Sequence, residues 1–124
     1  MYMLRHTGQK TEIFVTRFYW VGAGQEEPIR VNPLDFSLVI VNYNTCIFLQ
    51  SCLHSIYRSQ GQVTYEVIVV DNNSSDGSTT MLYDQFPQTQ VIANKHNYGF
   101  AKACNQGIAS TNSDYVVIMN SDIE

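Results

Sequence analysis

Polar residues that could bind a nucleotide and a divalent cation follow three apolar runs in this sequence. The runs are Phe36–Val41, Glu66–Val70 and Tyr115–Met119. The loops after them carry amide, hydroxyl and carboxylate groups: Asn42–Thr45, Asp71–Ser78 and Asn120–Asp122. Parallel α/β sheets bind ligands just past the carboxyl ends of their strands. We therefore expect these three loops to converge at one edge of a sheet.

Asp71 ends the second run, where a carboxylate is expected to face solvent and accept a hydrogen bond from a ligand N–H. The residue types that follow it, over Asn72–Ser75, are also those that any strand-to-helix turn prefers. Asp76 precedes Gly77 and Ser78, so helix capping explains it as well as ligand contact does. Both interpretations of this loop stay open.

The third loop, Asn120–Asp122, offers one carboxylate and one amide directly after a strand-like run. Mg²⁺ or Mn²⁺ commonly takes one or two protein carboxylates and leaves substrate phosphates to complete the octahedron. Taken alone the tripeptide is an ordinary turn. At the end of a buried strand, one crossover beyond Asp71, it becomes a candidate metal loop.

A further polar segment, Asn94–Gly99, precedes a run of small residues. Its backbone N–H groups, the start of the next helix and Lys95 would suit a phosphate group. A left-handed turn at Gly99 with solvated neighbours is the alternative. Tyr43, in the first loop, either stacks on a base, offers its hydroxyl, or seals the top of the sheet.

Strands and helices alternate from Phe36 onward. Apolar runs of strand length are Phe36–Val41, Tyr65–Val70, Gln90–Ala93 and Tyr115–Met119. Helical spacing predicts helices over Cys46–Ser59, Ser78–Phe86 and Phe100–Ser110. Gly107 inside the last helix predicts its close approach to the sheet. The alternation predicts an α/β fold: a Rossmann-like, mostly parallel sheet with helices on both faces.

Residues 1–35 differ from the rest and are expected to be an amino-terminal extension or the tail of a preceding segment. Glu12–Val21 is β-branched and aromatic, which predicts a strand. Gly22, Pro28 and the Asn32–Pro33 turn then interrupt the pattern.

Composition excludes several classes of function. The 124 residues fit one domain, and 44% hydrophobic with 15% charged residues indicates a globular chain. A formal charge of −4 without a basic stripe argues against nucleic-acid binding. No run approaches the ~18 apolar residues of a membrane span, and there is no signal-peptide core. We expect a cytoplasmic protein whose membrane contact, if any, comes from sequence outside these residues.

Histidine and cysteine patterns for metal binding are missing from the sequence. The three cysteines form no CxxC pair, which favours buried free thiols over a disulfide framework or a zinc site. The three histidines have no HxxxH or HExxH spacing.

Taken together, four stretches resemble family 2 glycosyltransferases with the GT-A fold. They are Leu38–Asn44, Glu66–Ser78, Asn97–Gly107 and Tyr115–Asp122. Residues 36–124 are similar in order and spacing to the amino-terminal, nucleotide-sugar-binding half of that family, above all to its rhamnosyltransferase-like members. The resemblance implies a truncated GT-A domain over residues 36–124 and leaves residues 1–35 outside it.

The resemblance implies a site for a UDP- or dTDP-sugar. Tyr43 and the backbone around it would contact the uracil or thymine base, and Asp71 would accept the N–H of that base. The segment from Asn97 to Asn105 would line the pocket near ribose and phosphate. The nucleotide-binding residues implied in this way are Tyr43, Asn44, Asp71, Asn73, Asn97, Gly99, Asn105 and Asn120.

Asp122 matches the last acid of the family's DxD motif, which implies that it holds Mg²⁺ or Mn²⁺ against the diphosphate. The charge that grows on a nucleoside diphosphate leaving group needs such a Lewis acid. Asn120 replaces the first acid of the motif, so the metal shell has one charge fewer. The general base, an Asp or Glu in this family, is expected beyond Glu124 with the acceptor-binding half. No catalytic residue is therefore assigned.

The implied activity is the inverting transfer of a sugar such as rhamnose to a glycan or lipid-linked acceptor, in bacterial polysaccharide synthesis at the inner face of the membrane. Truncation predicts weak nucleotide binding without transfer, and an exposed apolar edge at Tyr115–Met119. The alternative is a truncated, non-catalytic nucleotide-binding or scaffold module. A dinucleotide-dependent oxidoreductase would need GxGxxG after the first strand, and Asn42–Thr45 contains no glycine.

Overall fold

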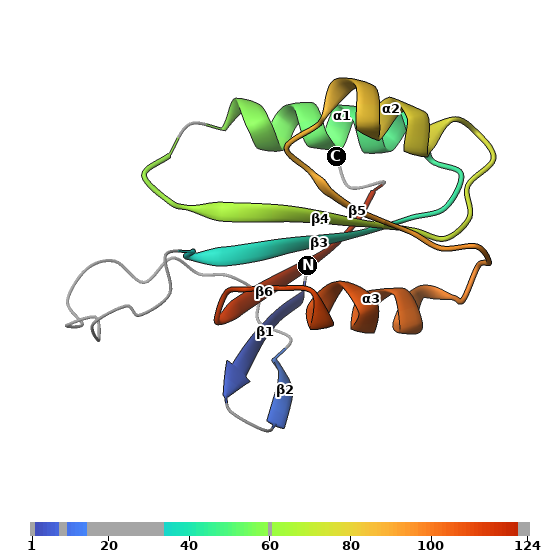
Figure 1. The fold of residues 1–124 in the computed structure, drawn as a ribbon. Helices are drawn as coiled ribbons and strands as arrows, with labels where there is room; N and C mark the ends of the chain where they lie inside the picture. The colour runs from blue at the N-terminus through green and yellow to red at the C-terminus, as the bar shows by residue number, and fades with distance from the viewer. Residues whose placement is uncertain (1, 8–9, 15–33, 60, 122–124) are drawn as a thin grey trace.

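The computed structural model describes residues 2–7, 10–14, 34–59 and 61–121, which form one six-stranded sheet flanked by helices (Figure 1). The strands are β1 (Tyr2–Thr7), β2 (Lys10–Phe14), β3 (Phe36–Asn42), β4 (Tyr65–Asp71), β5 (Gln90–Ala93) and β6 (Tyr115–Asn120). The helices are α1 (Cys46–Arg58), α2 (Ser78–Gln85) and α3 (Phe100–Ala109). From Phe36 onward the predicted α/β alternation is confirmed, and the helix and strand ends lie within one residue of those expected.

The sheet is parallel in its central part. Its strand order is β2-β1-β6-β3-β4-β5, and β6, β3, β4 and β5 run in the same direction. Each of these strands is followed or preceded by a helix that crosses back over the sheet, so all three helices begin at the same end of the molecule (Figure 1). The mostly parallel, Rossmann-like sheet with helices on both faces is therefore confirmed.

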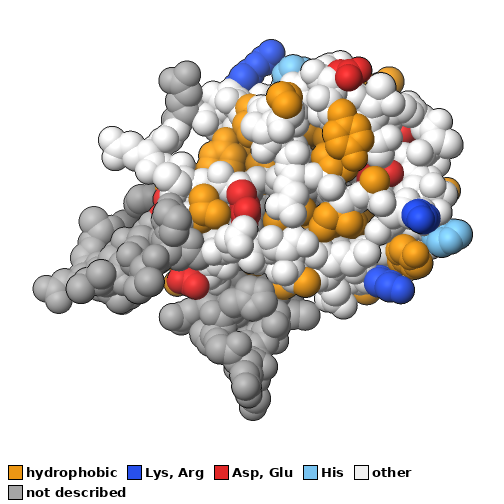
Figure 2. Space-filling view, in the orientation of Figure 1, with side chains coloured by type: hydrophobic (Ala, Val, Ile, Leu, Met, Phe, Trp, Pro, Cys, Tyr) orange, Lys and Arg blue, Asp and Glu red, His pale blue; other side chains and the backbone are white. Residues whose placement is uncertain are grey.

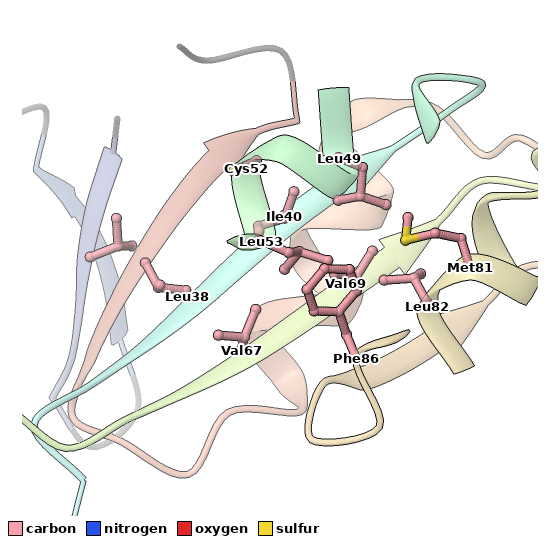
Figure 3. Close-up of a cluster of buried hydrophobic side chains, with 11 residues drawn as sticks. Leu38, Ile40, Leu49, Cys52, Leu53, Val67, Val69, Met81, Leu82 and Phe86 are labelled. Carbon is pink, nitrogen blue, oxygen red and sulfur yellow. The ribbon is translucent and has the colours of Figure 1, made fainter. Parts of the chain in front are cut away.

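Alternate residues of the central strands point to two separate cores. On one face Leu38, Ile40, Val67 and Val69 pack with side chains of α1 and α2, as Figure 3 shows. On the other face Val39, Val41, Ile68 and Val70 pack beneath α3. Burial on both faces explains why these strands read as unbroken apolar runs. Burial of each such aliphatic side chain stabilises the fold by about 1.5–3 kcal/mol, so the two cores fix the positions of the strand ends.

Gly107 lets α3 lie directly on the sheet. A Cβ at this position would come within 2.3 Å of Val39 Cγ1 and 3.2 Å of Val39 Cγ2. Val39 is fully buried in the central strand β3, so it has little room to move. The close approach predicted from this glycine is confirmed.

An amino-terminal hairpin covers the β6 edge of the sheet. β1 pairs with β6 in antiparallel register, from Tyr2 opposite Ile118 to Arg5 opposite Tyr115, and β2 pairs with β1. The expected open edge at Tyr115–Met119 is therefore wrong, because residues 2–7 supply the missing neighbour. The strand expected over residues 12–21 begins earlier, in β2, and its part from residue 15 lies outside the described residues.

Candidate functional site

The strand register brings the predicted polar loops to one edge of the sheet. Asn42 of β3 lies opposite Asp71 of β4, and Val41 of β3 lies opposite Asn120 of β6. Asp71 is also opposite Ala93, the last residue of β5. Because these four strands are parallel, the segments that follow them all leave the sheet at the same end. The predicted convergence of the loop backbones follows from this register.

Hydrogen bonds join neighbouring loops directly, both between side chains and from backbone to side chain. The Thr45 and Ser121 hydroxyls lie 2.5 Å apart, which links the loop after β3 to the loop after β6. The backbone N–H of Asn44 donates to Ser74 Oγ over 2.9 Å. The backbone N–H of Ser75 donates to the Asn44 side chain, at Oδ1, over 2.8 Å. The loops after β3, β4 and β6 are thus a connected unit rather than independent turns.

Asp71 is buried, contrary to the expectation that its carboxylate faces solvent. Only 1% of the residue is exposed. Asn42 Nδ2 and Ser74 Oγ donate to Asp71 Oδ1 over 2.7 and 2.6 Å, and the Ser74 amide donates to Oδ2 over 2.9 Å. The carboxylate is therefore paired within the protein, and its first role in this structure is to shape the turn after β4.

The side-chain amides of three buried or half-buried residues form a hydrogen-bond network where β4 and β5 end. Asn72 Nδ2 donates to the Gly99 carbonyl over 3.2 Å, and Asn72 Oδ1 accepts from Asn94 Nδ2 over 3.0 Å. Asn94 and Gln106 exchange two further bonds of 2.7 and 2.9 Å. This chain of amides ties the ends of β4 and β5 to α3. Sequence reasoning placed Asn72 and Asn94 in polar turns but did not predict their hydrogen bonds to each other and to Gln106, because the partners lie up to 27 residues away.

Asp76 caps two helices with one carboxylate. Its Oδ2 accepts from the amide of Cys46, the first residue of α1, over 2.8 Å. Its Oδ1 accepts from the amide and the hydroxyl of Ser78, the first residue of α2, over 3.1 and 2.5 Å. Partial burial would raise the pKa of Asp76, but the hydrogen bonds from Ser78 and Cys46 outweigh it, and the pKa is lowered. Of the two interpretations offered by the sequence, the structure supports capping.

The segment before α3 is a turn that only glycine fits well. Gly99 has φ +86°, and its amide donates to Asn97 Oδ1 over 2.9 Å. Asn97 and Asn105 are exposed, as is Lys95. The left-handed turn predicted for Gly99 is wrong in detail, because its ψ is 168°, which gives an extended backbone with a positive φ that glycine alone adopts readily. The segment leaves the first amides of α3, which have no partner within the helix, at the same end of the sheet as the other loops.

Tyr43 is half exposed, at 50%, so part of its side chain is accessible from solvent. Asn44 and Asn73 are also exposed and adopt positive φ values of 52° and 65°. Asn120 is exposed at the end of β6, whereas Ser121 is buried. These polar groups are accessible to a ligand, although Asp71 between them is not.

Asp122, the predicted metal ligand, lies outside the described residues, as does Glu124. Across the part of the chain that the structure describes, no group of three His, Cys, Asp or Glu side chains could hold a metal ion. The candidate metal ligands at this end of β6 are oxygen atoms: one from the Asn120 side-chain amide and, by sequence, one from the Asp122 carboxylate. An oxygen-only set fits a hard divalent cation.

The cysteines take no part in this edge of the sheet as reactive groups. Cys52 and Cys104 are buried, and burial raises the pKa of both thiols. A raised pKa keeps a thiol protonated and unreactive at neutral pH. The expectation of buried free thiols is confirmed for these two residues, while Cys46 is partly exposed.

Comparison with known proteins identifies the family. The sequence profile of Glycosyl transferase family 2 matches residues 37–124. The chain belongs to this family. The resemblance noted in the sequence is therefore confirmed at the level of family 2.

Two curated bacterial proteins are similar to part of this chain. Glycosyltransferase GlyG of Streptococcus pneumoniae is 32% identical over 91 residues, which cover 69% of this chain and 29% of GlyG. The succinoglycan biosynthesis protein ExoO of Rhizobium meliloti is 29% identical over 89 residues, covering 71% and 25%. The chain thus spans about a quarter to a third of the length of these relatives.

Two solved structures are similar to this chain in fold. A mannosyltransferase from Pyrobaculum calidifontis, in complex with GDP-Man and Mn²⁺, has a TM-score of 0.63 at 24% identity, and the match covers 70% of this chain and 27% of that one. Staphylococcus aureus TarS 1–349 in complex with UDP also has a TM-score of 0.63, at 23% identity, with the same coverage. These likenesses support the GT-A type of sheet for this family 2 chain.

Proposed function

We propose that this chain carries the donor-binding part of an inverting, metal-dependent glycosyltransferase. The donor is a UDP- or dTDP-sugar, with rhamnose as one candidate sugar, and the acceptor is a glycan or a lipid-linked sugar in bacterial polysaccharide synthesis. The observation that carries the proposal is the joined set of loops at the carboxyl ends of β3, β4, β5 and β6, in a chain of family 2. Open parallel sheets bind ligands at this edge.

The nucleoside end of the donor is assigned to the loops after β3 and β4. The half-exposed Tyr43 ring offers a surface for a uracil or thymine base. Asn44 and Asn73 present exposed amides on either side of the Ser74 turn. Asp71 Oδ2 accepts one hydrogen bond in this structure and has capacity for a second, but with 1% of the residue exposed a base N–H would reach it only if the Ser74 turn moved aside.

The diphosphate end is assigned to the loop before α3 and to the end of β6. The first turn of α3 presents backbone N–H groups and the positive end of its dipole to an anion. Asn97 and Gly99 precede this turn, and Asn105 lies one turn further along α3. A Mg²⁺ or Mn²⁺ held by Asp122 and the Asn120 amide would neutralise charge on the departing nucleoside diphosphate. The acceptor hydroxyl attacks the anomeric carbon as the bond to the diphosphate breaks, and its proton passes to a base supplied from beyond Glu124.

Calorimetric titration of the chain with UDP and dTDP, each with and without Mn²⁺, tests the proposal. We expect binding that strengthens with Mn²⁺, and we expect this strengthening to be lost in Asp122→Asn. Tyr43→Ala should weaken binding about tenfold, since base–aromatic stacking is worth ~1–3 kcal/mol. Asp114→Asn is the matched control, because Asp114 is exposed at the opposite end of β6. Equal binding by the Tyr43 variant, the Asp122 variant and the control would contradict the proposal.

The second candidate is a non-catalytic nucleotide-binding or scaffold module. The three hydrogen bonds that already engage Asp71 favour it, because they leave this carboxylate a structural role. Under this alternative, UDP affinity is the same with Mn²⁺ and without it, and Asp122→Asn has no effect. The titration described above therefore separates the two candidates.

A further inference from the structure

The corner between β5 and α3 gathers cationic and aromatic side chains on the outside of the molecule. This α3 corner consists of Lys95, His96, Tyr98, Phe100 and Lys102, all of them exposed. Tyr98 is 41% and Phe100 45% exposed, so both rings offer apolar surface to a partner from outside the chain. The corner is rich in groups that bind an interface between water and an apolar phase.

Ring contacts join three of these side chains. Lys102 Nζ lies 4.2 Å from the centroid of the Tyr98 ring, in a cation–π contact. The His96 ring meets the Tyr98 ring edge-on, with the two centroids 5.9 Å apart. Beneath them, Gly99 is fixed through its carbonyl by Asn72 and through its amide by Asn97. The loop is thus anchored from below, and its aromatic and cationic groups are presented outward.

The charge of the corner differs from that of the chain as a whole. The net charge is −4, yet the sequence from residue 85 to residue 113 contains no Asp or Glu. Residues 34–121 contain three Lys or Arg residues, and two of these are Lys95 and Lys102. In Figure 2, cationic and His side chains lie beside hydrophobic ones on the side where Figure 1 places the start of α3. The corner is a local positive site on an acidic protein.

The geometry points to the α3 corner as a docking surface for anionic lipid headgroups. Lysine ammonium groups bind lipid phosphates, while Tyr98 and Phe100 enter the boundary between headgroups and acyl chains. A polyanion such as nucleic acid would need a longer basic stripe, and it has no acyl-chain boundary for Tyr98 and Phe100 to enter. Membrane contact would thus arise from residues within this sequence, not only from parts outside it as expected above. Docking would bring the candidate donor site close to the bilayer, since both lie at the same end of the sheet.

Vesicle sedimentation tests this assignment. The protein is mixed with vesicles of phosphatidylcholine alone, or of phosphatidylcholine with phosphatidylglycerol, at low and high salt. We expect binding only to the vesicles with phosphatidylglycerol, and weaker binding at high salt. Removing one lysine should lower the partition coefficient about fivefold, and Lys95→Gln with Lys102→Gln about 25-fold. Tyr98→Ser should lower it at both salt concentrations, because the ring contributes apolar contact.

Arg58→Gln provides the matched control, since Arg58 is an exposed cation at the far end of α1. It removes the same charge and should leave binding within a factor of two of wild type, a margin set by long-range attraction alone. All substituted side chains are exposed, and circular dichroism verifies that each variant is folded. Equal losses in Arg58→Gln and the lysine variants would overturn the proposal, as would absence of binding to phosphatidylglycerol vesicles by folded wild-type protein.

Discussion

Gly107→Ala should destabilise the fold by pushing α3 away from β3. The new Cβ would lie 2.3 Å from Val39 Cγ1, whereas carbon atoms in contact prefer about 3.5–4.0 Å. The two groups must therefore separate by more than 1 Å, and Val39 is fully buried. Overpacking of this kind costs about 1–3 kcal/mol, and alanine returns up to about 1 kcal/mol through its higher helix propensity. We expect the free energy of unfolding to fall by about 1–2 kcal/mol.

Urea denaturation followed by circular dichroism measures this loss as a shift of the midpoint by about 0.5–1 M. Gly61→Ala is the control, because a Cβ at Gly61 would meet Val63 at an ordinary 3.5 Å. The double variant Gly107→Ala, Val39→Ala should lose less than the sum of the single variants, with a coupling of about 0.5–3 kcal/mol. A Gly107→Ala protein as stable as wild type, or strictly additive losses, would refute the close packing of α3 on β3.

Three further outcomes follow from the described contacts. Asp76→Asn should lower stability by about 1 kcal/mol near neutral pH, since two helix N-termini lose a charged cap. The pKa of Asp76 is lower in the folded state than in the unfolded state, where it is about 3.9. Its contribution to stability is therefore present above the unfolded pKa and is lost as the pH falls through the folded pKa. Thermal melts of wild type and variant should converge in acid. Asn94→Ala should cost about 1–3 kcal/mol by stranding the Gln106 amide, whereas Asn105→Ala, on the exposed face, should melt like wild type. Deletion of residues 1–14 should expose the β6 edge and produce concentration-dependent association in sedimentation velocity, and a strictly monomeric deletion variant would contradict the β1–β6 pairing.

The central sheet was predictable because its signal is local. Strands buried on both faces, such as Leu38–Val41 and Ile68–Val70, must be continuously apolar, and the helices between them carry residues at helical spacing. The edge that binds ligands in such sheets then follows from parallel pairing alone. The close approach of α3 to the sheet at Gly107 was predictable for the same reason, since a glycine inside a helix indicates a close neighbour.

The environment of individual side chains was not predictable in this way. Asp71 was expected to face solvent, but its burial depends on Asn42, 29 residues earlier, which the β3–β4 register places opposite it. The Asp76 cap on α2 is local, whereas its bond to Cys46 spans 30 residues. The β1–β6 pairing joins opposite ends of the sequence, and strand preference in Tyr2–Thr7 depends on that partner more than on its own residues.

The most direct measurement of the proposed donor site is an amide NMR titration of the chain with UDP and Mg²⁺. We predict shift changes in the loops that leave the carboxyl ends of β3, β4 and β5, at residues 43–45, 72–76 and 97–102. Residues 61–64 and 112–114, which precede β4 and β6 at the opposite end of the sheet, should keep their positions. Shifts confined to that opposite end, or the same small shifts across the whole spectrum, would contradict a nucleotide site at the carboxyl edge.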